Sequence, residues 1–142
     1  MQLHSIISLG LAVGTTGLAV KYGDQTARRF GVTFLANWLV SLAVDSGDFQ
    51  NTGLALFCVD ALTLIYFIRA SLQARRVWTL IATAFMALIV ASHLATTIDL
   101  RVTINTFRMG MALCSYGILA CVGFGTWRAR QKRARALVAA AE

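Results

Sequence analysis

The sequence contains no proline, little negative charge and no catalytic motif. Because proline is missing, no helix is forced to kink by a lost backbone N–H, and we expect long uninterrupted helices. Asp and Glu together number 6, and charged residues make up only 13% of the 142 residues. The chain also lacks an H-E-x-x-H motif, a glycine-rich phosphate loop and a Ser, His and Asp grouping within reach by spacing. These absences argue against an enzyme, and we predict no catalytic residue.

Cysteine is scarce and follows no pairing pattern. Cys58, Cys114 and Cys121 lie within apolar segments and form no C-x-x-C pair. We therefore interpret them as small buried thiols rather than as a disulfide framework or a metal site.

Apolar residues dominate the chain, with 58% hydrophobic residues and a mean hydropathy of +0.69. Five apolar segments approach the ~20 residues that a helix needs to cross the hydrocarbon of a bilayer. They are residues 3–20, 30–44, 52–68, 77–98 and 107–127. This pattern predicts an integral membrane protein, in which lipid supplies much of the solvent.

Positive charge is concentrated in three short segments, which hold eleven of the 13 Lys and Arg residues. The segments contain Lys21, Arg28 and Arg29; Arg69, Arg75 and Arg76; and Arg128, Arg130, Lys132, Arg133 and Arg135. Because positively charged loops stay in the cytoplasm during insertion, all three should share the cytoplasmic side. Segment 30–44 must then cross although it has only fifteen residues. The amino terminus is predicted outside and the carboxyl terminus in the cytoplasm.

The predicted fold is all-α, a bundle of five transmembrane helices over residues 1–127 followed by a basic cytoplasmic helix or tail over residues 128–142. Tyr22, Trp78 and Trp127 fall at the predicted cytoplasmic boundary, where aromatic side chains favour the interface. The net charge of +7 suits membrane lipids rather than nucleic acid, because the basic residues lie just beyond the apolar segments. The predicted headgroup contacts are Arg128, Arg130, Lys132, Arg133 and Arg135.

Small residues form a ridge on the first and on the fifth segment. The first ridge is Gly10, Gly14 and Gly17, and the second is Gly117, Cys121 and Gly125. Apolar burial drives helix association weakly in lipid, so close contact depends on small residues that let backbones approach. Each ridge is expected at a helix contact, within one chain or between copies in a homo-oligomer.

Asp60 is the most informative polar residue inside a span. It lies eight positions into the third segment, ~12 Å deep by the helical rise. Asn37 lies eight positions below Asp45 in the second segment, so Asn37 and Asp60 should meet at one depth. A carboxylate at that depth needs a partner, a cavity or a proton.

Other polar residues are predicted around Asp60. Ser115 and Tyr116 of the fifth segment should reach the same layer, and His93 should lie just above it. Arg108 could descend toward Asp60 or pair with Asp99 at the rim. The cluster is interpreted as a hydrogen-bond network that fixes the register of the helices, or as an ion or proton path or an outward pocket for a small or lipid-like molecule.

Two histidines raise one cofactor alternative. His4 and His93 fall on different helices at similar depth, as bis-histidine ligation of haem b requires. Otherwise no cofactor is predicted.

A few short runs carry a resemblance over the last three segments. They are Val59-Asp60, His93-Leu94-Ala95, Asp99, Ser115-Tyr116 and Gly125-Thr126-Trp127-Arg128. In these runs the chain resembles a group of short polytopic bacterial inner-membrane proteins without an assigned activity. The resemblance implies a multi-pass protein of the bacterial inner (cytoplasmic) membrane and carries over no catalytic role. Where that group is expected to have proline after the Ser-Tyr pair, this chain has Gly117.

Two functions follow as hypotheses. The first is a non-enzymatic membrane protein that acts through contacts, as an accessory subunit of a membrane complex or as a homo-oligomer. The second is a small transporter or lipophilic-ligand-binding protein with Asp60 as its ionisable centre. A bis-histidine haem protein is a third alternative.

Overall fold

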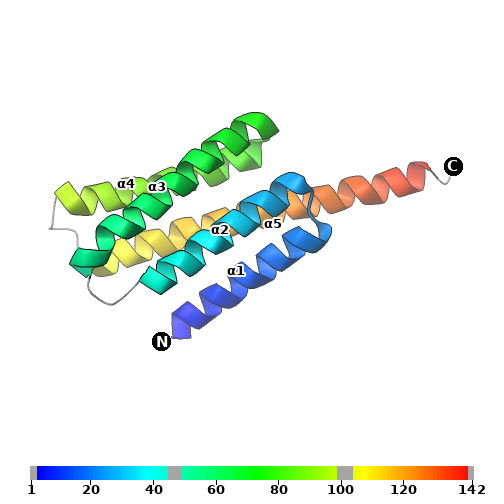
Figure 1. Cartoon of the computed structure of the whole chain (residues 1–142). Helices are drawn as coiled ribbons and strands as arrows, with labels where there is room; N and C mark the ends of the chain where they lie inside the picture. Colours follow the sequence, from blue (N-terminus) through cyan, green and yellow to red (C-terminus); the bar gives the residue numbers. More distant parts are fainter. Residues whose placement is uncertain (1–2, 45–48, 99–103, 141–142) are drawn as a thin grey trace.

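The structure is a computed structural model with five α-helices (Figure 1). It describes the backbone of residues 3–44, 49–98 and 104–140, and the side chains of residues 8–43, 54–95 and 106–140. The helices are α1 (Leu3–Tyr22), α2 (Gln25–Val44), α3 (Phe49–Ala74), α4 (Val77–Ile98) and α5 (Ile104–Ala139). The prediction of an all-α chain with five helices is confirmed.

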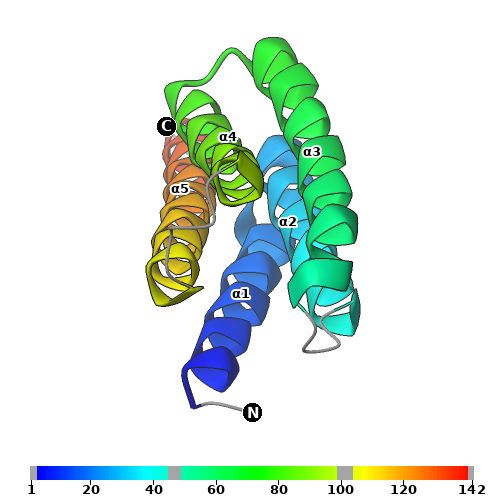
Figure 2. The same cartoon turned by 90° about the vertical axis from the view of Figure 1, so that its left-hand side faces the viewer.

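The helices pack as a ring that closes between the first and the last. Each helix contacts the next along the chain, and α1 also contacts α5. A further contact joins α2 to α5 across the ring (Figure 2). The buried residue Gly31 of α2 sits at this crossing, 3.5 to 3.6 Å from Thr16, Ala19 and Val122 measured from where a Cβ would lie. A small residue is therefore what allows α2 to approach both α1 and α5.

Three helices are long and apolar enough to cross a membrane, in the part of the chain that the structure describes. The qualifying stretches are Leu54–Ala74, Val77–Ala95 and Thr106–Ala139. The other two helices, α1 and α2, are 20 residues long each, about 30 Å by the helical rise. Because α2 begins at Gln25, it is longer than the fifteen-residue segment expected from hydropathy. α5 continues without interruption through the basic tail to Ala139.

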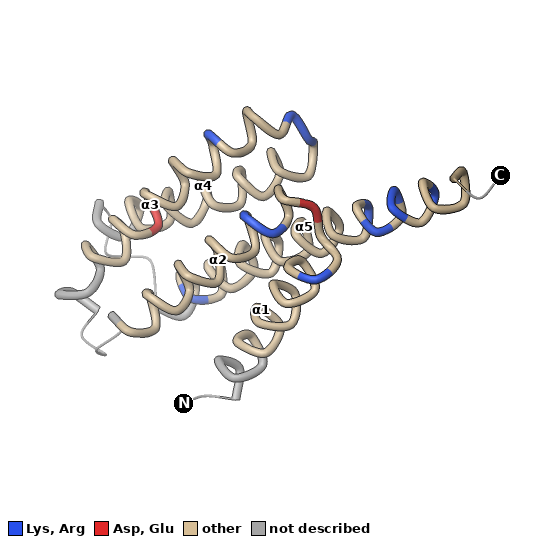
Figure 3. Tube along the Cα trace, turned by 45° about the vertical axis from the view of Figure 1, so that its right-hand side comes forward, with Lys and Arg blue, Asp and Glu red and all other residues tan. Residues whose placement is uncertain are grey.

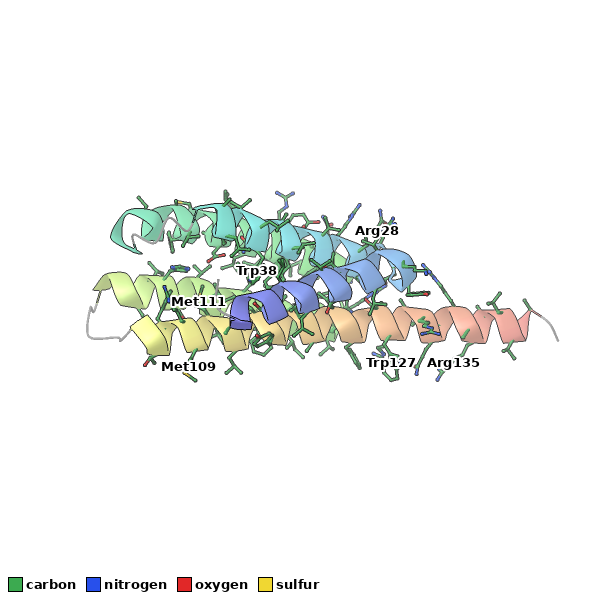
Figure 4. The ribbon with its side chains drawn as sticks, turned by 90° about the horizontal axis from the view of Figure 1, so that it is seen from below. Arg28, Trp38, Met109, Met111, Trp127 and Arg135 are labelled. Atoms are coloured by element: carbon green, nitrogen blue, oxygen red, sulfur yellow. The ribbon has the colours of Figure 1, made fainter. Side chains whose placement is uncertain are left out.

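The aromatic core lies near the end of the bundle where the turns α1–α2 and α3–α4 are. The Phe30 ring packs against Phe67 at 4.4 Å and against Trp78 at 5.4 Å between centroids. Trp78 is only 5% exposed, so it is a core residue and not the interfacial anchor expected from the sequence. Trp127 is 53% exposed and projects with Arg135 from the outer side of α5 (Figure 4). The sequence pattern does not contain the direction in which Trp78 points, because packing against Phe30 sets it.

The three basic segments meet at this same end of the molecule (Figure 3). Arg76, in the α3–α4 turn, forms an ion pair with Asp24 in the α1–α2 turn. The tail reaches the α1–α2 turn as well, because Arg133 donates a hydrogen bond of 3.2 Å to the Gly23 carbonyl. The Arg130 guanidinium lies 5.4 Å from the centroid of the Tyr22 ring. These side-chain contacts therefore hold the three basic segments together at one end of the molecule.

Asp24 also determines where α2 begins. It directly precedes the helix, and its Oδ1 accepts a hydrogen bond of 2.9 Å from the Ala27 backbone N–H. This is an N-cap, which satisfies one of the backbone donors that the first turn leaves without a helical acceptor. One carboxylate therefore caps α2 and forms an ion pair with the α3–α4 turn.

The two glycine ridges behave differently. A Cβ at Gly117 would lie 2.7 Å from the Phe85 ring, and one at Gly125 would lie 2.8 Å from the Trp78 ring. The α5 ridge, with half-buried Cys121 between them, therefore packs against α4 within the chain. By contrast, a Cβ at the exposed residues Gly10, Gly14 and Gly17 would meet no heavy atom of the described residues within 4 Å. The intrachain alternative accounts for the α5 ridge but not for the α1 ridge.

Candidate functional site

A buried polar cluster joins α2, α3 and α4 in the half of the bundle opposite the basic end. Its members are Asn37 from α2, Asp60 and Thr63 from α3, and His93 from α4, each between 4% and 8% exposed. The helix sequences explain the placement, since each of these residues interrupts an otherwise apolar face. Polar groups so buried must find partners within the protein.

Asn37 bridges the Asp60 and Thr63 side chains of α3. Its Nδ2 donates a hydrogen bond of 2.9 Å to Asp60 Oδ1. Its Oδ1 accepts a hydrogen bond of 2.8 Å from the Thr63 hydroxyl, which also lies 2.9 Å from the Val59 carbonyl of its own helix. This pattern fixes the orientation of the Asn37 amide, because only the NH₂ group can donate to Asp60.

His93 approaches the other oxygen of the carboxyl group. Its Nε2 lies 3.0 Å from Asp60 Oδ2. The contact is an ion pair when the imidazole is protonated and the carboxyl group is ionised. An unbalanced charge at this depth would be costly. Asp60 and His93 therefore form one interacting unit.

The network reaches α5 through an aromatic contact. The His93 ring meets the Phe107 ring edge-to-face, with centroids 5.2 Å apart. Phe107 is buried near the start of α5. The cluster therefore links four of the five helices at one level.

The structure places the other residues that were expected around Asp60 on α5 or outside the described residues. Ser115 and Tyr116 are half-buried on α5, and Tyr116 packs against the apolar core. Arg108 is exposed on α5 and so does not descend into the bundle. Its alternative partner Asp99, like Asp45, falls outside the described residues. His93, expected one level higher, is instead a direct partner of Asp60.

Thr63 was not anticipated from the sequence. It lies three positions after Asp60, so the two share a face of α3, and this spacing is the signal that could have identified it. A threonine in an apolar helix commonly bonds its own helix backbone, as Thr63 also does with Val59, and this makes its second role hard to foresee.

The haem alternative stays a prediction. His93 Nε2 lies 3.0 Å from Asp60 Oδ2. The side chain of His4 is outside the described side chains. Among the side chains that are described, no three His, Cys, Asp or Glu residues gather into a group suited to a metal ion.

The tail residues predicted to contact lipid headgroups are all accessible on α5. Arg128, Arg130, Lys132, Arg133 and Arg135 are exposed.

No protein-family model, curated protein or solved structure matches the chain.

Proposed function

We propose that this chain is a non-enzymatic protein of a bacterial inner membrane that acts through contacts with other membrane helices, in a homo-oligomer or as an accessory subunit. It crosses the bilayer five times, with its amino terminus outside and its basic end in the cytoplasm. Support comes from three helices suited to spanning, two further helices of about 30 Å, and the gathering of three basic segments at one end.

The observation that carries this proposal is the outward glycine face of α1, formed by Gly10, Gly14 and Gly17. A Cβ at any of these positions would meet no heavy atom of the described residues within 4 Å, so the face is open with respect to the described part of the chain. Helix faces of this spacing pack closely against other helices in membranes because backbones can approach. The opposite face of α1 is already used, since Ala12, Thr16 and Ala19 are buried against the bundle.

The Asp60 network supports a structural role for the interior. Asn37 and His93 each contact one oxygen of the carboxyl group, and Thr63 donates a hydrogen bond to Asn37. Interhelical polar contacts of this kind fix the register of neighbouring helices in lipid. A fixed interior would leave α1 as a rigid face for assembly.

The test compares Gly14→Leu with Gly110→Leu in lipid nanodiscs or native membranes. Gly110 is a matched control because a Cβ there also meets nothing within 4 Å among described atoms, but it has no glycine one turn away. Oligomer size or partner recovery, read by cross-linking and native mass spectrometry, should fall for Gly14→Leu alone. A wild-type chain that is only monomeric and recovers no partner would contradict the proposal.

A second candidate function rests on the Asp60–His93 contact. A buried pair of ionisable side chains is the expected centre of a small transporter or of a site for a lipophilic ligand. Asp60→Asn keeps the shape of the side chain and removes the acid. If this candidate holds, Asp60→Asn abolishes transport or binding in vesicles while assembly is unchanged; if the network is structural, stability alone falls.

A further inference from the structure

A groove of about 850 Å³ opens between α4 and α5 at the basic end of the bundle. Its apolar walls are formed by Trp78, Ile81 and Phe85 of α4 and by Cys121 and Phe124 of α5. The floor exists because Gly117 and Gly125 have no side chains, which lets the Phe85 and Trp78 rings lie against the α5 backbone. Both walls belong to helices suited to crossing a membrane.

The mouth of this groove is strongly positive. Arg75, Arg76, Arg128 and Lys132 line it together with one carboxylate, Asp24. Among the described side chains Asp24 pairs with Arg76, so the charges of Arg75, Arg128 and Lys132 are left in excess at the mouth. α4 begins at Val77 on the same rim and has no acidic residue in its first turn, so its positive dipole end adds to the field.

Arg75 occupies an unusual backbone position at this mouth. Its φ of 50° is left-handed, and its N–H donates a hydrogen bond of 3.0 Å to the Ser71 carbonyl to close the end of α3. Glycine is the usual residue at such a helix terminus, and another residue is strained there by roughly 1 kcal/mol or more. The chain nevertheless carries an arginine at this position, with its side chain lining the groove.

The dimensions of the groove match one leaflet. From Gly117 to Arg128 the α5 wall advances by eleven residue steps, roughly 17 Å by the helical rise. Half of the hydrocarbon core is roughly 15 Å thick. The basic side chains at the mouth would therefore lie at the level of the lipid headgroups, and the apolar part of the groove is about as deep as one leaflet of hydrocarbon is thick.

We infer that this groove binds an anionic phospholipid, with the headgroup phosphate among Arg75, Arg128 and Lys132 and an acyl chain along Ile81, Phe85 and Phe124. A phosphate alone would leave the apolar walls uncovered, and a neutral lipid would leave the positive charges at the mouth without an anionic partner. The inference shares with the proposed function only the placement of α4 and α5 in a membrane. It does not depend on assembly through α1.

The test uses the full chain in nanodiscs of mixed phosphatidylcholine and phosphatidylglycerol, with lipid retention counted by native mass spectrometry. Arg128→Gln/Lys132→Gln removes two charges from the groove, whereas Arg130→Gln/Arg135→Gln removes two from the same tail outside it. Retention of phosphatidylglycerol should fall roughly tenfold or more for the first pair, since these two charges line the groove and would face the bound phosphate directly. The second pair weakens only the general attraction of the tail to an anionic surface, so its loss should be clearly smaller. Equal losses for both pairs would overturn the inference in favour of diffuse surface attraction.

A second variant separates the groove from its charges. Cys121→Trp fills the apolar channel without altering any charge, so it should also reduce retention, and unchanged retention would overturn the inference. Excess inorganic phosphate should not displace the lipid, because phosphate cannot replace the acyl contacts, and displacement would overturn the role of the channel. Gly14→Leu should leave lipid retention unchanged, so failure of the assembly proposal can be distinguished from failure of this one.

Discussion

His93 Nε2 lies 3.0 Å from Asp60 Oδ2, which joins α4 to α3 inside the bundle. The other carboxyl oxygen is held by the Asn37 amide from α2. Asp60 is thus the residue on which three helices converge. The contribution of each partner to stability depends on the presence of the others, because the group left behind would remain buried and polar.

The pair predicts a non-additive double-mutant cycle. His93→Ala and Asp60→Ala should each lower the free energy of unfolding by about 1–3 kcal/mol, since each leaves a buried polar atom without its partner. The double variant should lose less than the sum, with a coupling of about 1 kcal/mol. Unfolding in mixed detergent micelles measures all three values.

Ser92→Ala is the matched control for His93→Ala on α4. The Ser92 hydroxyl bonds only the Leu88 carbonyl of its own helix among the hydrogen bonds described for it, so the change should stay within about 0.5 kcal/mol. Strict additivity of Asp60→Ala and His93→Ala would show that the two side chains do not stabilise each other.

Gly117→Ala should destabilise the α4–α5 contact. The new Cβ would lie 2.7 Å from the Phe85 ring, so the ring must move, at about 1–3 kcal/mol. Adding Phe85→Leu should restore part of the loss, because the smaller side chain makes room. Gly110→Ala meets open space among described atoms and should be neutral or stabilising by up to about 1 kcal/mol. Thermal unfolding of the wild type and these three variants measures the effects. Equal losses of stability for Gly117→Ala and Gly110→Ala would contradict the close contact between Gly117 and Phe85.

Asp24 predicts two separable losses. Asp24→Asn keeps a side-chain oxygen that caps α2 but removes the ion pair with Arg76, so it should lower stability by less than about 1 kcal/mol. Asp24→Ala removes both interactions and should lower it by about 1–2 kcal/mol. Arg76→Gln should resemble Asp24→Asn in thermal unfolding. The assignment of the cap fails if Asp24→Asn and Asp24→Ala unfold at the same temperature.

Much of the fold is predictable because it depends on local patterns. Apolar length indicates the helices, and missing proline keeps them unbroken. Counting residues from the outer loop places Asn37 and Asp60 at one depth, and their side chains do meet. The charge pattern places the basic segments together, and contacts such as the Asp24–Arg76 pair hold them there.

What could not be predicted depends on how each helix is rotated about its axis. The sequence shows two similar ridges, yet Gly117 faces Phe85 while Gly14 faces away from the described bundle. Trp78 turns inward against Phe30. Such directions are set by packing between helices distant in sequence, which periodicity in one helix does not contain. The left-handed backbone conformation of Arg75 could not be predicted either, because glycine is the residue usually found in that conformation.

Labelling of single cysteines tests the central claim, that the basic segments of the chain lie on the cytoplasmic face of the membrane. In a background without Cys58, Cys114 and Cys121, the variants Arg75→Cys, Arg133→Cys and Arg108→Cys are exposed to a membrane-impermeant maleimide on intact cells. We expect immediate labelling only of Arg108→Cys, and labelling of Arg75→Cys and Arg133→Cys only after the membrane is permeabilised. Labelling of Arg75→Cys and Arg133→Cys from opposite faces would contradict the account.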